Sequence, residues 1–144
     1  YKPNKPKQLF CRTNYRLAVH EDGTVYGTED INDVYSSLII EAQRRSYVSI
    51  RGVKSKLYVC VNGTGEIYGS RHMGKHCFFQ ENIERNFFNS YAFTMPNPEN
   101  GSRRRRNRRT VYLTINNNGV TKLTRARGLK KAQFITLVPP PKLL

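Results

Sequence analysis

The sequence has no tryptophan, only three cysteines and no long apolar run. Three cysteines can form at most one disulfide, which excludes the disulfide framework of many small secreted domains. No stretch reaches 18 apolar residues, so the sequence predicts no transmembrane helix and no membrane insertion. The first ten residues are polar and basic, which is not the pattern of a signal peptide, although one could precede this segment.

Acidic residues are missing from the C-terminal part of the chain. The 144 residues carry 25 Lys and Arg against 10 Asp and Glu, a formal net charge of +15. Twelve of the basic residues and none of the acidic ones lie in 103–144. Because no carboxylate neutralises these cations locally, the pattern favours a polyanionic partner: nucleic acid, anionic lipid or sulfated polysaccharide.

Motifs of catalysis and metal binding are also absent. The chain has no Gly-x-Ser-x-Gly, no phosphate-binding loop and no His-Glu-x-x-His. His72, His76 and Cys77 are close in sequence, but on a strand or loop this spacing does not make a credible zinc site. We therefore expect a protein that is not an enzyme and holds no cofactor and no metal.

Three segments of the chain resemble one another: 15–28, 57–70 and 111–124. Each has an alternating apolar strand, an Asx/Gly turn and a second strand. In the second segment, the alternation predicts that Leu57, Val59 and Val61 face the core. The three turns contain glycines that supply the left-handed positions of tight hairpins: Gly23, Gly65 and Gly119.

Five more strand-like runs lie between these hairpins: 37–42, 47–52, 77–82, 90–95 and 134–138. The sequence thus predicts about twelve strands in three pseudo-repeats of about four. A β-trefoil fits this pattern, because six strands close a barrel and three hairpins cap one end. We expect an all-β protein with a flexible basic segment at 1–8 and a single β-trefoil domain at 9–140. A long Arg-rich loop is expected at about 96–109, and the lack of tryptophan disfavours a lectin that stacks sugars.

Several motifs, taken in order, resemble the fibroblast growth factor family from about residue 7 to residue 140. They include Leu-Phe-Cys-Arg-Thr at 9–13, Asp-Gly-Thr-Val-Tyr-Gly-Thr at 22–28, Gly-Glu-Ile-Tyr-Gly-Ser at 65–70, His-Cys-Phe-Phe at 76–79 and Glu-Arg-Asn-Phe-Phe-Asn-Ser-Tyr at 84–91. The resemblance implies a secreted β-trefoil ligand. Such a ligand binds heparan sulfate and a receptor tyrosine kinase with immunoglobulin-like ectodomains.

The resemblance places the heparan sulfate site after the third glycine turn, in 116–132. This segment offers five cations: Lys122, Arg125, Arg127, Lys130 and Lys131. Convergent cations suit a sulfated chain in their own right, since guanidinium groups can hold an oxyanion through two hydrogen bonds. The segment has Lys-Leu-Thr-Arg at 122–125 in place of the family's Gly-x-x-Arg-Gly spacing. A merely solvated basic face is the alternative interpretation.

For the receptor surface, the resemblance implies six residues: Phe10, Glu81, Phe88, Asn89, Leu137 and Val138. Phe88 keeps the apolar ring of the family's tyrosine but loses its hydroxyl, and with it one hydrogen bond of about 0.5–1.5 kcal/mol. Glu29 departs from the basic residue that many members have there. The alternative is that Phe88, Leu137 and Val138 belong to the core.

Six arginines of the expected loop are unusual for the family: Arg103, Arg104, Arg105, Arg106, Arg108 and Arg109. Three interpretations stay open. The arginines could extend the polyanion site, form a cleavage site for a convertase, or act as a nuclear localisation or nucleic-acid patch.

Two glycosylation sequons occur, at Asn100 and Asn62. Asn100 is sterically the better acceptor because it lies in the long loop, whereas Asn62 sits in a tight turn where it suits the backbone. For the cysteines, the resemblance implies that Cys11 and Cys77 are buried and unpaired.

These features together predict a secreted, extracellular growth factor that uses heparan sulfate as a co-receptor and activates a fibroblast growth factor receptor-type tyrosine kinase. We expect a monomer that is dimerised on heparin or on the receptor, with a nuclear pool reached through 103–109 as a further option. The alternative is an intracellular β-trefoil protein that binds a protein partner, such as a channel tail, or nucleic acid, and activates no receptor.

Overall fold

The computed structural model describes residues 4–96 and 108–144, which form twelve β-strands and four short 3₁₀ helices. The strands are β1 (Gln8–Cys11), β2 (Arg16–Val19), β3 (Val25–Thr28), β4 (Leu38–Arg44), β5 (Tyr47–Gly52), β6 (Tyr58–Val61), β7 (Ile67–Ser70), β8 (Phe79–Ile83), β9 (Asn89–Pro96), β10 (Arg108–Ile115), β11 (Thr121–Thr124) and β12 (Phe134–Leu137). The helices are η1 (Val34–Ser36), η2 (Lys75–Cys77), η4 (Lys130–Ala132) and η5 (Pro141–Leu143). None of the described helices has the length and apolar character needed to cross a membrane.

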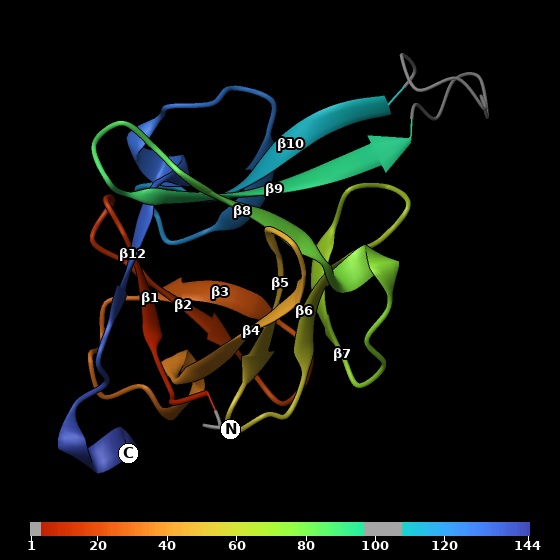
Figure 1. Ribbon diagram of the computed structural model, residues 1–144. Coiled ribbons are helices and arrows are strands. Elements are labelled where there is room, and N and C mark those ends of the chain that lie inside the picture. Colours follow the sequence, from red (N-terminus) through yellow and green to blue (C-terminus); the bar gives the residue numbers. More distant parts are fainter. Residues whose placement is uncertain (1–3, 97–107) are drawn as a thin grey trace.

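Six of the strands close a barrel (Figure 1). β1 pairs with β12, β12 with β9, β9 with β8, β8 with β5 and β5 with β4, all antiparallel. The ring closes between β4 and the chain just before β1. There the N–H groups of Lys7 and Leu38 each donate to the other's carbonyl oxygen at 2.8 Å. Closure satisfies the backbone groups that an open sheet would leave exposed at its edges.

Three hairpins, β2–β3, β6–β7 and β10–β11, extend from β1, β5 and β9 and meet at one end of the barrel. The N–H of Gly27 donates to the carbonyl of Gly119, and the N–H of Gly69 donates to the carbonyl of Gly23, both at 2.8 Å. A Cβ atom on Gly27 would lie 2.9 Å from the Gly119 oxygen, so this contact requires glycine. The equivalent position of the third hairpin is Leu123, which departs from the repeat.

One hydrophobic core fills the barrel and the space beneath the hairpins. Leu57, Val59 and Val61 are buried in it, as their alternation predicted. β10 is buried on both faces, because Tyr112 on the opposite face packs with Ala92 and forms a second, smaller cluster. The all-β, twelve-stranded β-trefoil predicted from the repeats is confirmed.

Two boundaries differ from the sequence prediction. β1 begins at Gln8, whose side chain is buried, so residue 8 belongs to the domain and not to a flexible segment. β9 extends to Pro96 and β10 begins at Arg108, so Arg108 and Arg109 lie in a strand. They do so because each has a pairing partner on β9, and Arg109 pairs with Met95. Arg103, Arg104, Arg105 and Arg106 lie outside the described residues.

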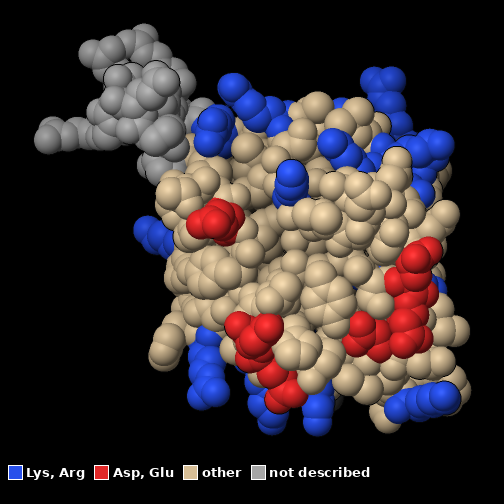
Figure 2. Space-filling view, turned by 180° about the vertical axis from the view of Figure 1, so that it is seen from behind, with Lys and Arg blue, Asp and Glu red and all other residues tan. Residues whose placement is uncertain are grey.

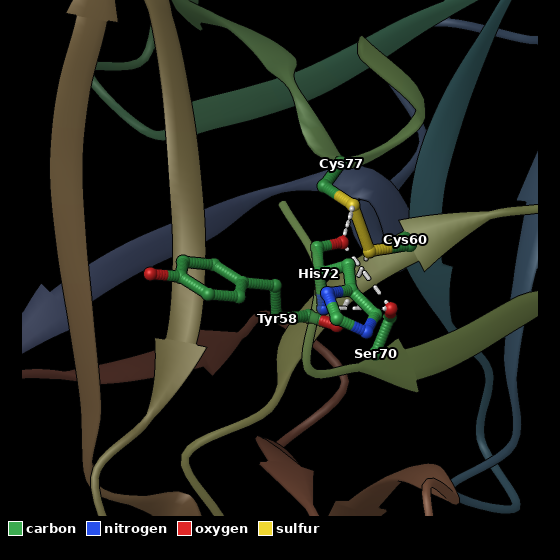
Figure 3. Close-up of a disulfide and its surroundings, with 5 residues drawn as sticks. All are labelled: Tyr58, Cys60, Ser70, His72 and Cys77. Atoms are coloured by element: carbon green, nitrogen blue, oxygen red, sulfur yellow. Dashed lines mark hydrogen bonds between the residues drawn. A yellow bond between two sulfur atoms is a disulfide. The ribbon is translucent and has the colours of Figure 1, made fainter. Parts of the chain in front are cut away.

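The expectation that Cys77 is unpaired is wrong. Cys60 of β6 and Cys77 of η2 form a disulfide, drawn in Figure 3. Ser70 shapes the intervening loop, because its Oγ accepts from the N–H of His72 at 3.1 Å and donates to the His72 carbonyl at 3.2 Å. Cys11 is buried and free, as expected. Pairing was not visible in the sequence because it depends on the return of the chain after β7 to the side of β6.

We predict that replacing both Cys60 and Cys77 by serine lowers the free energy of unfolding by about 3 kcal/mol, since the disulfide closes a loop of 17 residues in the unfolded chain. Urea unfolding measures this change. As a direct control, thiol titration in denaturant should find one reactive cysteine without reductant and three after reduction. Three reactive thiols without reductant would contradict the pairing.

Candidate functional site

Four neighbouring strands bring together the residues expected to contact a receptor. Phe10 lies on β1, Glu81 on β8, Asn89 at the start of β9 and Leu137 at the end of β12. Phe88 precedes β9 and Val138 follows β12. The strands are adjacent in the order β1, β12, β9, β8. We call these six residues the candidate receptor surface.

Two aromatic rings of this surface are covered by arginines that the sequence analysis missed. The guanidinium carbon of Arg16 lies 4.8 Å from the centroid of the Phe10 ring, and that of Arg12 lies 5.1 Å from the Phe88 ring. Arg12 is also fixed by Gln133, whose Oε1 accepts from Nη1 at 2.7 Å. Cation–π contacts of this kind contribute about 0.5–1 kcal/mol at exposed sites. Each ring is therefore packed against a guanidinium group in the free protein.

The Glu81 carboxylate belongs to the candidate receptor surface and also accepts a hydrogen bond from the interior of the fold. Its Oε2 accepts a hydrogen bond of 2.8 Å from the hydroxyl of Tyr91, which is fully buried. Burial, together with the Glu81 charge, raises the pKa of the Tyr91 phenol well above its usual value, so this proton stays in place. Phe88 and Leu137 are half-buried, whereas Val138 is 71% exposed and lies outside the core.

The turn between β8 and β9 carries a further aromatic residue that the sequence analysis missed. Phe87 is 84% exposed and has a φ of 68°. Its N–H donates to the carbonyl of Glu84 at 2.9 Å, and the N–H of Glu84 donates to the carbonyl of Phe88 at 2.7 Å. Four other turns repeat this hydrogen-bond pattern, with Asn14, Gly23, Gly65 and Gly119 in the position of Phe87.

A phenylalanine in this position is strained. The left-handed region costs an ordinary residue about 1–2 kcal/mol, and Gly or Asn relieves most of that cost. Phe87 keeps a large apolar side chain in solvent at this cost. The sequence did hold a signal, because the turn at 84–88 has no glycine although it joins two strands of the same hairpin.

The candidate polyanion residues follow one another along the chain after the third glycine turn. Lys122 lies on β11, Arg125 and Arg127 in the following loop, and Lys130 and Lys131 in η4. We call these five residues the cationic segment. All are exposed except Lys131, which is half-buried. Among the residues that the structure describes, Arg127 is the sole Lys or Arg with a carboxylate within 4.0 Å.

The buried thiol of Cys11 contacts the backbone of the cationic segment. The Cys11 thiol lies 3.6 Å from the carbonyl oxygen of Lys130 and 3.4 Å from that of Lys131, as a weak donor to both. Gly128 has a φ of 84°, which lets the loop reverse before η4. The segment is therefore a shaped loop anchored to β1.

Arg127 connects the cationic segment to the β8–β9 turn. Its Nε lies 3.2 Å from both carboxylate oxygens of Glu84, and its Nη2 donates to Oε2 at 2.9 Å. Hydrogen bonds from Arg127, and secondly one from the Ser90 hydroxyl, lower the pKa of the Glu84 carboxyl. Arg127 is thus engaged in an ion pair within the protein and is less available to an external anion than the other four cations. The sequence spacing did not indicate this contact.

Charge is segregated on one face of the molecule. Figure 2 shows this face, on which Lys and Arg gather along opposite edges and the acidic side chains form separate groups between them.

Of the two sequons, Asn62 is engaged in its turn, because its Oδ1 accepts from the N–H groups of Thr64 and Glu66 at 3.0 Å and 2.9 Å. Asn100 lies outside the described residues.

The fold and the site define a β-trefoil with an anchored cationic segment beside a surface of partly exposed apolar side chains. Comparison with known protein families adds a match over residues 5–135 to the family model described as Fibroblast growth factor. The chain therefore belongs to the fibroblast growth factor family.

Curated relatives agree with this assignment. Fibroblast growth factor 3 from Gallus gallus is 32% identical over 117 residues, which cover 78% of this chain and 53% of the relative. Fibroblast growth factor 7 from Homo sapiens is 28% identical over 127 residues, 88% of this chain and 60% of the relative. Fibroblast growth factor 2 from Rattus norvegicus is 34% identical over 87 residues, 60% of this chain and 56% of the relative. The chain spans little more than half the length of these relatives.

We predict that Arg127→Gln raises the pKa of the Glu84 carboxyl toward its ordinary value, because the guanidinium is the largest cause of the lowering. A lowered pKa in the folded state stabilises the protein above the pKa of the unfolded chain, and this stabilisation is lost as the pH falls through the folded-state pKa. The difference in melting temperature between wild type and variant should therefore be present at pH 7 and close in acid.

Titration of the Glu84 side chain by NMR, and thermal melts across pH, measure the two effects. Arg125→Gln is the matched control, because Arg125 has no carboxylate within 4.0 Å among the described residues. It should leave the Glu84 titration unchanged. A Glu84 pKa that does not move in Arg127→Gln would show that the ion pair does not form in solution.

Proposed function

We propose that this protein is a secreted growth factor that binds heparan sulfate and activates a receptor tyrosine kinase with immunoglobulin-like ectodomains. The observation that carries the proposal is the placement of two features on one rigid fold. One is a cationic segment with free charges, and the other is a neighbouring surface of half-exposed aromatic and aliphatic side chains. Family membership supports a signalling ligand and not an enzyme.

Heparan sulfate is the polyanion that we assign to the cationic segment. Lys122, Arg125 and Lys130 are exposed and have no carboxylate partner among the described residues. Their charges are therefore available to sulfate groups, and the release of counterions would drive binding at low salt, as it does for nucleic acids. The assignment of Arg103, Arg104, Arg105, Arg106, Arg108 and Arg109 to this site rests on charge alone.

The candidate receptor surface has the composition of an interface core. Phe10 and Phe88 offer aromatic rings that pack against arginines, Val138 is exposed, and Glu81 and Asn89 supply polar groups beside them. Interfaces of this kind derive most of their affinity from a few aromatic and aliphatic anchors. Phe87 adds an anchor, because its large apolar ring is 84% exposed and its backbone is in a strained conformation.

Secretion agrees with the disulfide between Cys60 and Cys77. Disulfides persist in oxidising compartments and are rare in the cytosol. This observation weighs against the intracellular alternative, and the relatives named above are growth factors, which weighs against it further. In the proposed mechanism, a monomer gathers on the polysaccharide, which raises its local concentration and brings two receptors with their kinase domains together.

We predict that reversing four charges, with Lys122→Glu, Arg125→Glu, Lys130→Glu and Lys131→Glu, shifts elution from immobilised heparin to much lower salt. The loss of four cations removes the counterion release that favours binding. By analogy with nucleic acids, each lost contact should reduce the slope of log affinity against log salt concentration by roughly 0.7–0.9. Affinity measured across a salt series gives both the elution position and the slope.

The control is a second quadruple variant that changes the net charge by the same amount at other exposed positions. It carries Lys5→Glu, Lys54→Glu, Lys56→Glu and Arg71→Glu. It should elute much nearer to the wild type. Equal shifts for the two quadruple variants would mean that net charge alone binds heparin, and an unchanged elution position for the first would overturn the site assignment.

We predict opposite effects of Phe87→Asn on stability and on receptor binding. Asparagine tolerates the left-handed conformation, so the free energy of unfolding should rise by about 1 kcal/mol. Loss of the exposed ring should weaken binding to a receptor ectodomain by about tenfold. Urea unfolding, binding to ectodomains and receptor phosphorylation in responsive cells, with and without heparin, measure these effects.

Ile83→Asn is the matched control, because Ile83 is 73% exposed on the same hairpin but has no positive φ. It removes an exposed apolar side chain without relieving strain, so it should bring no gain in stability. If Phe87→Asn leaves binding and heparin-dependent phosphorylation intact, Phe87 is not an anchor. If the wild type causes no phosphorylation in any receptor-bearing cell line, with or without heparin, the proposed function fails.

A further inference from the structure

A pocket of about 710 Å³ opens on the molecule away from both surfaces described above. Its walls come from the turn before β5, the end of β6, η2 and the last part of β9. Asn89 of the candidate receptor surface lies at the opposite end of β9 from the pocket residues Thr94 and Met95. The cationic segment contributes no residue to the lining.

Apolar side chains make up most of the pocket surface. Tyr47, Val61, Phe78, Phe93 and Met95 line it. Val61 and Met95 are buried and belong to the core, and Phe93 packs against that core with its ring centroid 5.8 Å from that of Phe79. These groups are held by the core and do not need a ligand to be ordered. A volume of several hundred cubic ångströms with an apolar lining is typical of small-molecule sites.

Apart from Tyr47, the ionisable residues that line the pocket are basic. Arg44 and Arg45 line one side, and Lys75 and His76 line the other. No Asp or Glu is among the lining residues that the structure describes. The pocket therefore presents an apolar interior with positive charge at its margin, which is complementary to a molecule with an apolar body and an anionic head.

The disulfide holds two walls of the pocket in place. Cys60 precedes Val61 on β6, and Cys77 follows His76 in η2, so the crosslink fixes the distance between these walls (Figure 3). The imidazole of His76 lies beside the two sulfur atoms, all three potential ligand atoms being within 4.8 Å of one another. Because the sulfurs are bonded to each other, this trio offers no thiolate to a metal.

We propose that this pocket binds a small amphipathic anion, a single acyl chain that ends in a carboxylate or a phosphate. The chain lies against Phe78, Phe93 and Met95, and the head group pairs with Arg44 and Arg45 or with Lys75. A sulfated polysaccharide does not fit this site, because it has no apolar body to cover the aromatic lining. A neutral or cationic amphiphile does not fit either, since it leaves the basic margin unpaired.

The test uses the whole chain and 11-(dansylamino)undecanoic acid, a fluorescent carboxylate with an acyl chain. We expect saturable, one-to-one fluorescence enhancement well below the concentration at which the probe forms micelles. Laurate and dodecyl phosphate should both displace the probe, and comparison of these two competitors distinguishes a carboxylate from a phosphate head group. Dodecanol and dodecyltrimethylammonium should compete at least tenfold less well.

Chain length gives an independent measure of the apolar contact. Shortening the competing carboxylate from twelve to ten carbons should weaken it by about fourfold for each methylene group. An affinity that does not depend on chain length would overturn the proposal, because it would mean that the anion binds to surface cations alone.

Variants separate this pocket from the rest of the molecule. Thr94→Trp places a large ring on an exposed lining position of β9 and should block the probe, while Arg44→Glu with Arg45→Glu should weaken anionic competitors about tenfold. Lys54→Glu with Lys56→Glu, which carries the same change of charge away from the pocket, is the matched control and should bind normally. Circular dichroism and thermal melts establish that each variant is folded.

The outcome is independent of the proposed function. A protein with Lys130→Glu and Lys131→Glu should lose heparin affinity but keep the probe affinity of the wild type. If these changes abolish probe binding, the anion is held by the cationic segment and the pocket proposal is wrong. It is also wrong if folded Thr94→Trp binds the probe as tightly as the wild type.

Discussion

The structure depends on the burial of three apolar hairpins against one shared core. No repeat can cover its own row of aliphatic side chains, so each row is buried only when the other two are present. The six-stranded ring makes this possible, and the pair of hydrogen bonds between Lys7 and Leu38 completes it. The geometry of the candidate receptor surface follows from that closure, since its residues lie on or beside strands whose order the ring determines.

Two residues depart from a pattern that other parts of the chain repeat, and each lies next to residues of a candidate surface. Leu123 takes the place that Gly27 and Gly69 hold in the other two hairpins, and it stands within the chain segment that supplies the candidate sulfate ligands. Phe87 takes the left-handed position that Gly or Asn holds in four other turns. For Phe87 the departure costs local stability, as is expected of a residue with a role outside folding.

The ion pair of Arg127 with Glu84 gives the two candidate surfaces a physical contact. Glu84 opens the turn that carries Phe87 and Phe88, and Arg127 belongs to the cationic segment. A sulfate group that competes for the Arg127 guanidinium would remove hydrogen bonds from Glu84, at the base of the aromatic turn. The cationic segment and the candidate receptor surface are thus linked by the ion pair between Arg127 and Glu84.

The alternation of Leu57, Val59 and Val61 and the turn glycines were enough to determine the all-β class, because these features act within a few residues of one another. The recurrence of the same pattern in three segments then indicated the β-trefoil. The sequence likewise determined the concentration of charge after residue 102. Tertiary structure alone decided the pairing of Cys60 with Cys77, the covering of Phe10 and Phe88 by arginines, and the ion pair that occupies Arg127. Each of these contacts joins groups whose approach depends on how strands return around the barrel, and local sequence carries no record of that path.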